Sequence, residues 1–441
     1  MSVEIISGFA SAALGNERDV FVYLPPGYSP EDGPYPVVIA HDGQHLFSER
    51  GLQPSWDLDR TLDRLIGDGR VPPLVVAGVS NAGADRGAEY SHVRPYPRDP
   101  NTRPRGEQYE SLLVDELLPL LRRRYAISDK AEHTAVMGSS MGGLVSYHLS
   151  FRRPDVFGLA AVLSPFLVAV DPDTLEETCV HARFTEKGPS RLWIDIGGME
   201  GLIMVRPVRD LVDSLIDDLG YEPDRELRYR HDPDAIHHEH AWAERVESAL
   251  LHLFGADGPP TLVSAVEGGF AVGELLDPAP TGRRADGCVY SVLTSQTTWS
   301  PAPALERTSS RLLRAAEIGV VDVVSIAGAS EVTGSVEVLA GDDVALVEVV
   351  IVAPDPADDP AELVYFSGLL ARREAPGRYR GSWRLPRGVG LNGTVSRGWR
   401  IDGLDEAGDL VRRPVRADRD RTMDIRISGW TVPDDVDPHH S

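Results

Sequence analysis

Short apolar runs rich in β-branched residues alternate with longer helix-like segments up to about residue 255. Such an alternation is what a doubly wound α/β sheet requires. The predicted strands are Val20–Leu24, Pro36–Ala40, Leu74–Val79, Thr134–Met137, Leu159–Leu163, Arg191–Ile196 and Glu226–Tyr229. The alternation predicts an α/β domain with a doubly wound sheet.

Three of the intervening segments have helical character. Tyr109–Arg124 carries leucines at helical spacing, and Pro119 is expected to kink it. Pro207–Leu219 opens with a proline that suits the first position of a helix. Trp242–Phe254 completes the predicted helices of this domain.

The pattern changes after a glycine and proline cluster at 255–260, where we place a domain boundary. We therefore predict a catalytic domain at 1–256, a β-rich accessory domain at 257–432 and a disordered tail at 433–441. Alternating strands separated by turn residues predict an immunoglobulin-like sandwich in the accessory domain. The predicted strands are Ser335–Leu339, Val344–Val352, Leu363–Phe366, Tyr379–Leu385, Thr394–Ile401 and Met423–Ile427, and a helix is predicted at Arg307–Ile318.

Composition narrows the function classes. The chain has 441 residues and a formal net charge of −24, which disfavours nucleic acid and anionic membranes as partners. Its two cysteines cannot form a disulfide framework. No basic segment followed by an apolar core opens the sequence, and no apolar run approaches the roughly 20 residues of a membrane span. We therefore expect a cytoplasmic protein.

The run Gly138-Ser139-Ser140-Met141-Gly142 follows a predicted strand and precedes a helix-like segment. Gly-x-Ser-x-Gly in that context is typical of a nucleophile elbow, a sharp turn that exposes the central serine. The N-terminal amides of the following helix favour negative charge beside the hydroxyl. The alternative is an ordinary close-packed strand-to-helix turn. We favour the elbow because the chain also offers a base, an acid and an oxyanion site. The candidates come in the order serine, acid, histidine, which is the order found in folds with this elbow.

The segment 236–242 supplies the candidate base, since it follows the last predicted strand of the sheet. Imidazole can accept the serine proton and return it near neutral pH. We choose His237 and keep His238 and His240 as competitors. A zinc site is disfavoured because Trp242 stands where an HExxH motif needs its second histidine. We therefore predict no metal and no cofactor.

Glu200 is the candidate acid, because it lies in a glycine-rich loop just after the predicted strand 191–196. Its rival, Asp195, lies inside that strand, away from the carboxyl-end rim where ligands bind. For the oxyanion site, the backbone N–H of Met141 is one donor. The second is the backbone N–H of Gln44, in the segment His41–Phe47 after an early strand.

These segments together resemble the enterochelin esterase-like branch of the esterase D family of α/β hydrolases, over residues 15 to 255. The elements that carry the resemblance are RDVFVYLPPGY at Arg18–Tyr28, HDGQHLF at His41–Phe47, RGAEY at Arg86–Tyr90, GSSMGG at Gly138–Gly143, Ser164-Pro165-Phe166, GGMEG at Gly197–Gly201 and HHEHAW at His237–Trp242. The resemblance implies Ser140 as nucleophile, Glu200 as acid, His237 as base, and Gln44 and Met141 as oxyanion donors. As substrate-binding candidates we take His45, Arg86, Phe166 and Trp242.

The implied activity is a serine esterase that works through an acyl-enzyme on a small, aryl or siderophore-like ester. Alternatives are a feruloyl or acetyl-xylan type of polysaccharide esterase, an acyltransferase with the same residues, and a binding protein on a hydrolase scaffold. The arginine-rich loop 91–106 fits either a lid over an anionic substrate or a solvated surface. We also consider a homodimer contact through the C-terminal domain.

Overall fold

The computed structural model describes residues 2–48, 54–94, 103–170, 177–200, 202–309, 311–341, 344–354, 364–367, 369–386, 389–397, 402–417 and 419–430. The chain forms two compact units. The first contains Met1–Val263 and Thr281–Thr294, and the second contains Ser264–Pro280 and Ser295–Ser441.

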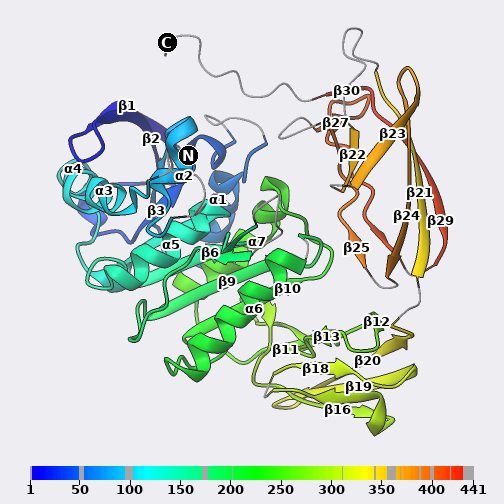
Figure 1. The fold of residues 1–441 in the computed structure, drawn as a ribbon. Coiled ribbons are helices and arrows are strands. Elements are labelled where there is room, and N and C mark those ends of the chain that lie inside the picture. Colours follow the sequence, from blue (N-terminus) through cyan, green and yellow to red (C-terminus); the bar gives the residue numbers. More distant parts are fainter. Residues whose placement is uncertain are drawn as a thin grey trace. The chain divides into compact units, whose positions relative to one another are not determined.

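One large mixed sheet organises the first unit (Figure 1), in the order β1-β2-β4-β3-β5-β6-β9-β10-β15-β14-β11. The strands from β4 to β10 pair in parallel, and β1 and β2 are antiparallel. All seven strands predicted for the catalytic domain are present within a few residues of the predicted bounds. The strands are β1 Ser2–Ser11, β2 Asn16–Leu24, β3 Val37–His41, β4 Val75–Val79, β5 Thr134–Ser139, β6 Leu159–Leu163, β9 Arg191–Gly197, β10 Leu227–Asp232, β11 Thr261–Ser264, β14 Thr281–Arg283 and β15 Val289–Ser291, with a separate hairpin of β7 Val168–Val170 and β8 Glu177–Cys179.

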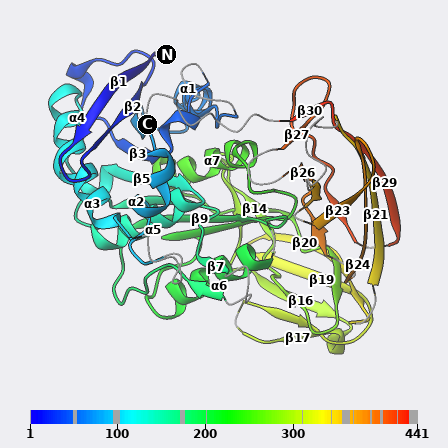
Figure 2. The ribbon, with the colours of Figure 1, turned by 45° about the horizontal axis from the view of Figure 1, so that its top comes forward.

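Helices cover both faces of this sheet (Figures 1 and 2), as a doubly wound fold requires. Because parallel crossovers are right-handed, α5 and α6 lie on one face and α1 lies on the other. There α1 packs against α7. The helices are α1 Leu58–Gly67, α2 Arg86–Glu89, α3 Gly106–Ser111, α4 Leu118–Arg124, α5 Met141–Arg152, α6 Leu202–Asp217 and α7 Glu239–Phe254.

Prolines mark two differences between prediction and structure. The helix predicted at Tyr109–Arg124 exists, but a π-helical turn at Leu112–Leu117 separates α3 from α4. A π turn just before Pro119 accommodates the missing N–H and the bulk of the ring. Pro207 does not open its helix, because α6 begins at Leu202. Pro207 therefore lies inside the helix and not at its first position.

The boundary between the two units differs from the one predicted at residue 256, because Thr281–Thr294 return to the first unit. There β15 pairs with β10, and Asp224 accepts hydrogen bonds from the backbone N–H groups of Leu293 and Thr294. The returning strand covers the edge of the parallel sheet, which would otherwise expose unpaired backbone groups. The sequence gives little sign of it because the strands involved have only three residues each.

The second unit is rich in β structure, as predicted, and holds two separate hydrophobic cores. The prediction of a helix at Arg307–Ile318 is wrong, because the structure has strands at Leu305–Arg307 and Leu313–Ala315. Leu313, Arg314 and Ala315 alternate buried, exposed and buried as a strand does. The sheets are β12 Gly268–Ala271, β20 Ser330–Leu339, β19 Gly319–Ala327 and β16 Gln296–Ser300; β13 Leu275–Leu276, β18 Leu313–Ala315 and β17 Leu305–Arg307; β26 Val395–Ser396, β22 Val364–Phe366, β23 Leu369–Ala375, β24 Arg378–Pro386, β21 Val344–Val352 and β29 Arg421–Arg426; β25 Gly390–Leu391 with β28 Val415–Arg416; and β27 Gly403–Leu404 with β30 Gly429–Trp430. The tail predicted at 433–441 lies outside the described residues.

None of the helices described by the structure is both long and apolar enough to cross a bilayer.

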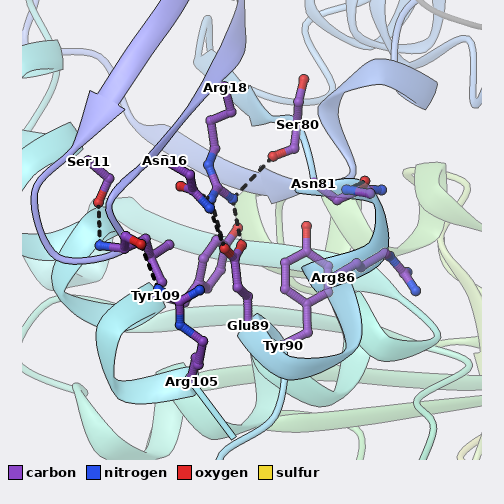
Figure 3. A network of polar contacts seen from close by, with 12 residues as sticks. Ser11, Asn16, Arg18, Ser80, Asn81, Arg86, Glu89, Tyr90, Arg105 and Tyr109 are labelled. Carbon is purple, nitrogen blue, oxygen red and sulfur yellow. Dashed lines mark hydrogen bonds and ion pairs between the residues drawn. The ribbon is translucent and has the colours of Figure 1, made fainter. Parts of the chain in front are cut away.

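A buried ion pair ties strand β2 to helix α2 (Figure 3). The guanidinium of Arg18 donates to both oxygens of Glu89, at 2.9 and 3.1 Å, and neither side chain is more than 1% exposed. Asn16 donates to the same carboxylate at 2.8 Å, so the charges are paired and hydrogen-bonded. A pair of this kind is costly to break, because the remaining partner is left as an uncompensated buried charge.

We predict that Glu89→Ala lowers the free energy of unfolding by about 3–5 kcal/mol, since it leaves the buried Arg18 charge without its carboxylate partner. Urea unfolding followed by circular dichroism measures the change. Glu222→Ala is the matched control, because Glu222 pairs with Arg225 at the surface, where both side chains are more than half exposed. That variant should change stability by less than about 1 kcal/mol. Equal losses in the two variants would contradict the prediction.

Buried neutral histidines form a second polar element of the core. His41 is 1% exposed, and its Nδ1 lies 2.9 Å from the Tyr109 hydroxyl. Burial lowers the pKa of His41 to about 3, and burial also holds the pKa values of His148 and His252 well below the usual range. In the unfolded chain these imidazoles take up protons below about pH 6.5, while the folded chain keeps them neutral.

Stability should therefore be complete above pH 6.5 and fall as the pH drops toward 3. Each buried histidine adds a slope of up to about 1.4 kcal/mol per pH unit. We predict that His41→Phe reduces the slope of unfolding free energy against pH by up to about 1.4 kcal/mol per pH unit between pH 6 and 4.5. This change in slope is expected whatever the effect of the substitution on stability at pH 8. Urea unfolding of wild type and variant across that range is the measurement. Identical slopes would show that His41 titrates normally in the folded protein.

Candidate active site

The strand-to-helix turn at Ser140 has the geometry of a nucleophile elbow. Strand β5 ends at Ser139, α5 begins at Met141, and Ser140 between them has φ +57° and ψ −121°. A non-glycine residue adopts such a conformation only where its surroundings impose it. The turn is tight enough that a Cβ on Gly138 would lie 2.7 Å from the backbone of Gly142. The Ser140 side chain thus lies at the N-terminus of α5.

Three predicted residues form one hydrogen-bonded chain. His237 Nε2 lies 2.9 Å from Ser140 Oγ, and His237 Nδ1 lies 2.7 Å from Glu200 Oε2. The ionised carboxylate can only accept a hydrogen bond, so Nδ1 carries the ring proton and Nε2 is free to accept the serine proton. The imidazole is 34% exposed, whereas the Glu200 side chain has no exposed surface. The arrangement suits proton transfer from the serine at an accessible surface, with a buried charge behind it.

The surroundings of Glu200 keep it ionised. Its second oxygen, Oε1, accepts from Ser164 Oγ at 2.7 Å and from the Gly197 N–H at 2.8 Å, and Arg245 Nη2 lies 3.5 Å away. Burial alone raises the pKa of Glu200. The hydrogen bond and charge of His237, the charge of Arg245 and the Ser164 bond outweigh burial, so the pKa lies below its ordinary value.

Neighbouring strand ends bring the acid and the histidine together. Strands β9 and β10 are parallel partners, and the loops after them are hydrogen-bonded to each other. Gly198 N–H donates to the Asp232 carbonyl at 2.7 Å, and Met199 N–H donates to the Ala235 carbonyl at 3.0 Å. This coupling fixes two loops that are nearly 40 residues apart in sequence.

The rival residues have other roles. Asp195 is fully buried on β9, where it accepts from Trp193 Nε1 at 2.9 Å and from Arg245 Nε at 3.1 Å. His238 caps α7, because its side chain accepts from the His240 N–H. The His240 ring stacks on that of His238, with centroids 5.3 Å apart.

The oxyanion loop, Asp42–His45, follows β3, the parallel neighbour of β5. Asp42 has φ +55°, and a side chain on Gly43 would collide with the backbone of Gly78 on β4. The loop also lies against the first turn of α5, since a Cβ on Gly142 would lie 3.1 Å from Asp42 Oδ2. The structure therefore places the segments of Gln44 and Met141 side by side at the carboxyl ends of adjacent strands.

Arg86 holds this loop in place. It donates to both Asp42 oxygens, at 2.7 and 2.8 Å, and Asn81 Nδ2 donates to Asp42 Oδ1 at 2.7 Å. Asn81 N–H also donates to the Gln44 side chain at 3.2 Å. Burial raises the pKa of Asp42, but the charge and hydrogen bonds of Arg86 lower it overall. The arginine predicted to bind substrate is thus engaged by a carboxylate of the protein.

The other substrate-binding candidates surround the same residues. The Trp242 ring is 6% exposed and meets the His237 ring edge-on, with centroids 5.0 Å apart. Phe166 is half-buried, and its N–H donates to the Ser140 carbonyl at 3.1 Å. His45 Nδ1 lies 3.3 Å from the Pro54 carbonyl. Residues 95–102 of the arginine-rich loop lie outside the described residues, and Arg105 donates to the Leu14 carbonyl at 2.6 Å.

Sequence reasoning missed Ser164 and Arg245, which contact the acid. The sequence indicates Arg245 as unusual, because it lies at helical spacing from Trp242 and Ala249 on the buried face of α7. A charged residue within an apolar stripe needs a buried partner. Ser164 belongs to the Ser-Pro-Phe element noted above, but nothing in its local sequence indicates a contact with Glu200.

In the described part of the chain, no three His, Cys, Asp or Glu side chains gather in a way that could hold a metal ion.

Comparison with known proteins identifies the family. The model of the Esterase family, described as "Putative esterase", matches residues 11–253. YbbA of Bacillus subtilis, an uncharacterized protein, is 25% identical over 263 residues, which cover 57% of this chain and 98% of YbbA. An endo-1,4-beta-xylanase/feruloyl esterase of Xylanibacter ruminicola is 28% identical over 164 residues, or 35% of this chain and 20% of that protein.

Solved structures with a similar fold include the enterobactin esterase FES of Shigella flexneri, with 18% identity and a TM-score of 0.44 over 57% of this chain and 59% of that one. A CE1 ferulic acid esterase of Anaeromyces mucronatus has 19% identity and a TM-score of 0.42 over 57% and 89%. Because the family model covers more than half of the sequence, the chain belongs to the Esterase family and is a carboxylic ester hydrolase with an α/β domain.

Proposed function

We propose that the protein is a serine esterase that acts through an acyl-enzyme, with Ser140 as nucleophile, His237 as base and Glu200 as acid. The observation that carries the proposal is the continuous chain from Glu200 through His237 to Ser140, with distances of 2.7 and 2.9 Å. Such a nucleophile, base and orienting group within hydrogen-bond reach is the arrangement that activates a hydroxyl for acyl transfer.

In the acylation step, Ser140 Oγ attacks the ester carbonyl while His237 Nε2 takes its proton. The carbonyl oxygen becomes an oxyanion, which the backbone N–H groups of Gln44 and Met141 and the N-terminus of α5 stabilise. Glu200 offsets the charge of the imidazolium that forms. His237 then gives the proton to the leaving alkoxide, and the alcohol departs.

In the deacylation step, a water molecule gives a proton to His237 and attacks the carbonyl carbon of the acyl group that is bound to Ser140 Oγ. The second tetrahedral intermediate uses the same oxyanion donors, and its collapse returns the proton to Ser140 and releases the acid. Access for water is consistent with the 34% exposure of the His237 side chain.

For the substrate, we propose a small ester with an aryl or siderophore-like acyl group. The feruloyl esterase part of the Xylanibacter relative's name supports an aryl acid as one alternative. Hydrolysis of methyl ferulate compared with a cyclic trilactone of catechoyl-serine separates these two classes.

We predict that Ser140→Ala lowers kcat for p-nitrophenyl acetate by about 10⁴-fold or more and abolishes labelling by a fluorophosphonate probe. Turnover and intact mass are the measurements. Ser139→Ala is the matched control and keeps the single adduct, because Ser139 is buried on β5 and the chain of contacts to His237 begins at Ser140. A wild-type protein that neither turns over the ester nor reacts with the probe would overturn the proposed function.

We predict that Arg86→Lys lowers kcat about tenfold with KM within about twofold. Lysine keeps the charge beside Asp42 but loses the two parallel hydrogen bonds that hold the oxyanion loop. Steady-state kinetics with p-nitrophenyl butyrate measure both constants. Arg64→Lys is the control and should match wild type, because Arg64 of α1 forms a partly exposed pair with Glu247 of α7. A raised KM with unchanged kcat would assign Arg86 to substrate binding instead.

A further inference from the structure

Ser164 occupies an unusual position behind the catalytic acid. It follows β6, and its backbone has φ +40°. Six non-glycine residues in the described part of the chain have a positive φ, and three of them are Asp42, Ser140 and Ser164. The first two belong to the oxyanion loop and the nucleophile elbow. Strained backbone persists where the surrounding structure imposes it, and it concentrates at functional sites.

The hydroxyl of Ser164 uses every hydrogen bond that it can make. It accepts from Trp242 Nε1 at 3.0 Å and from Arg245 Nη2 at 2.8 Å, and it donates to Glu200 Oε1 at 2.7 Å. Because both acceptor positions are occupied, the hydroxyl hydrogen can only point at Glu200.

Arg245 is held in turn by Asp195. Its Nε donates to Asp195 Oδ1 at 3.1 Å, and both side chains are fully buried. The same Asp195 oxygen accepts from the Ser164 N–H at 3.2 Å, so the three residues brace one another. Burial raises the pKa of Asp195 while that of Glu200 is lowered, which makes Glu200 the better-stabilised charge of the two.

The positive charge that arises on His237 as the serine attacks lies beside the Glu200 carboxylate, whose Oε2 is 2.7 Å from His237 Nδ1. The ionised Glu200 therefore favours the charged state of His237.

We propose that Ser164 and Arg245 are positioning residues for the catalytic acid. They hold Glu200 in the one orientation that presents Oε2 to His237, and Asp195 anchors Arg245. This inference rests on the proposed serine esterase function, and both residues act only through Glu200.

The test is a double-mutant cycle between Ser164→Ala and Glu200→Ala, with p-nitrophenyl acetate in single-turnover and steady-state kinetics. In the wild-type background Ser164→Ala should lower kcat about 10- to 100-fold with KM within about twofold, because a misplaced acid no longer orients the base. In the Glu200→Ala background it should cost less than about threefold, since no acid remains to be positioned. Ser150→Ala, at a buried serine of α5 that bonds the Tyr147 carbonyl, is the control.

Equal losses in both backgrounds would show that Ser164 supports the fold or the pocket, and the proposal would fail. Wild-type kcat in folded Ser164→Ala would overturn it as well. Thermal unfolding reports whether each variant folds. If Ser164→Ala does not fold, Arg245→Lys replaces it with the same two outcomes, because lysine has one ammonium in place of the two separate nitrogens that bond Asp195 and Ser164. Turnover and probe labelling of the wild type show separately whether the esterase function itself holds.

Discussion

The Glu200 carboxylate is ionised at a position where its side chain has no exposed surface. A buried charge is costly unless it is paired and hydrogen-bonded, and here one group from its own loop and three from elsewhere in the chain converge on it. Two come from its own loop and from His237. The others are Ser164 and Arg245, from the loop after β6 and from α7. Glu200 therefore links its own loop to the loop after β6, to the loop after β10 and to α7.

The sheet makes this convergence possible. Strands β3, β5, β6, β9 and β10 are parallel neighbours, so the segments that follow them meet at one edge. The oxyanion loop, the nucleophile elbow, the Ser164 loop, the acid loop and the histidine loop are those five segments. The last four are joined in series by backbone hydrogen bonds, from the Ser140 N–H to the Leu163 carbonyl, from the Ser164 N–H to the Asp195 carbonyl and from the Gly198 N–H to the Asp232 carbonyl. Adjacent strand ends thus fix these five segments relative to one another.

Arginine and carboxylate pairs perform the same task at three places in this domain. Arg18 pairs with Glu89, Arg86 with Asp42, and Arg245 with Asp195. The planar guanidinium presents several donors in a fixed geometry, which suits a site where position matters more than charge alone. None of these pairs is adjacent in sequence, so each fixes one element of the domain against another.

The sequence by itself determined the parallel strands and the strand-to-helix turn at Ser140, because these follow from local patterns. It offered Glu200 and His237 as candidates, with Asp195, His238 and His240 as rivals. Apolar runs indicate strands, glycines indicate the tight turn, and each candidate loop is identified by the predicted strand that it follows. It did not determine the returning strand β15 or the strand at Leu313–Ala315, since short strands depend on what they pair with. Nor did it show that Arg86 faces Asp42 or that Ser164 faces Glu200, because such contacts join residues tens of positions apart. Only the tertiary structure decides which buried charges meet.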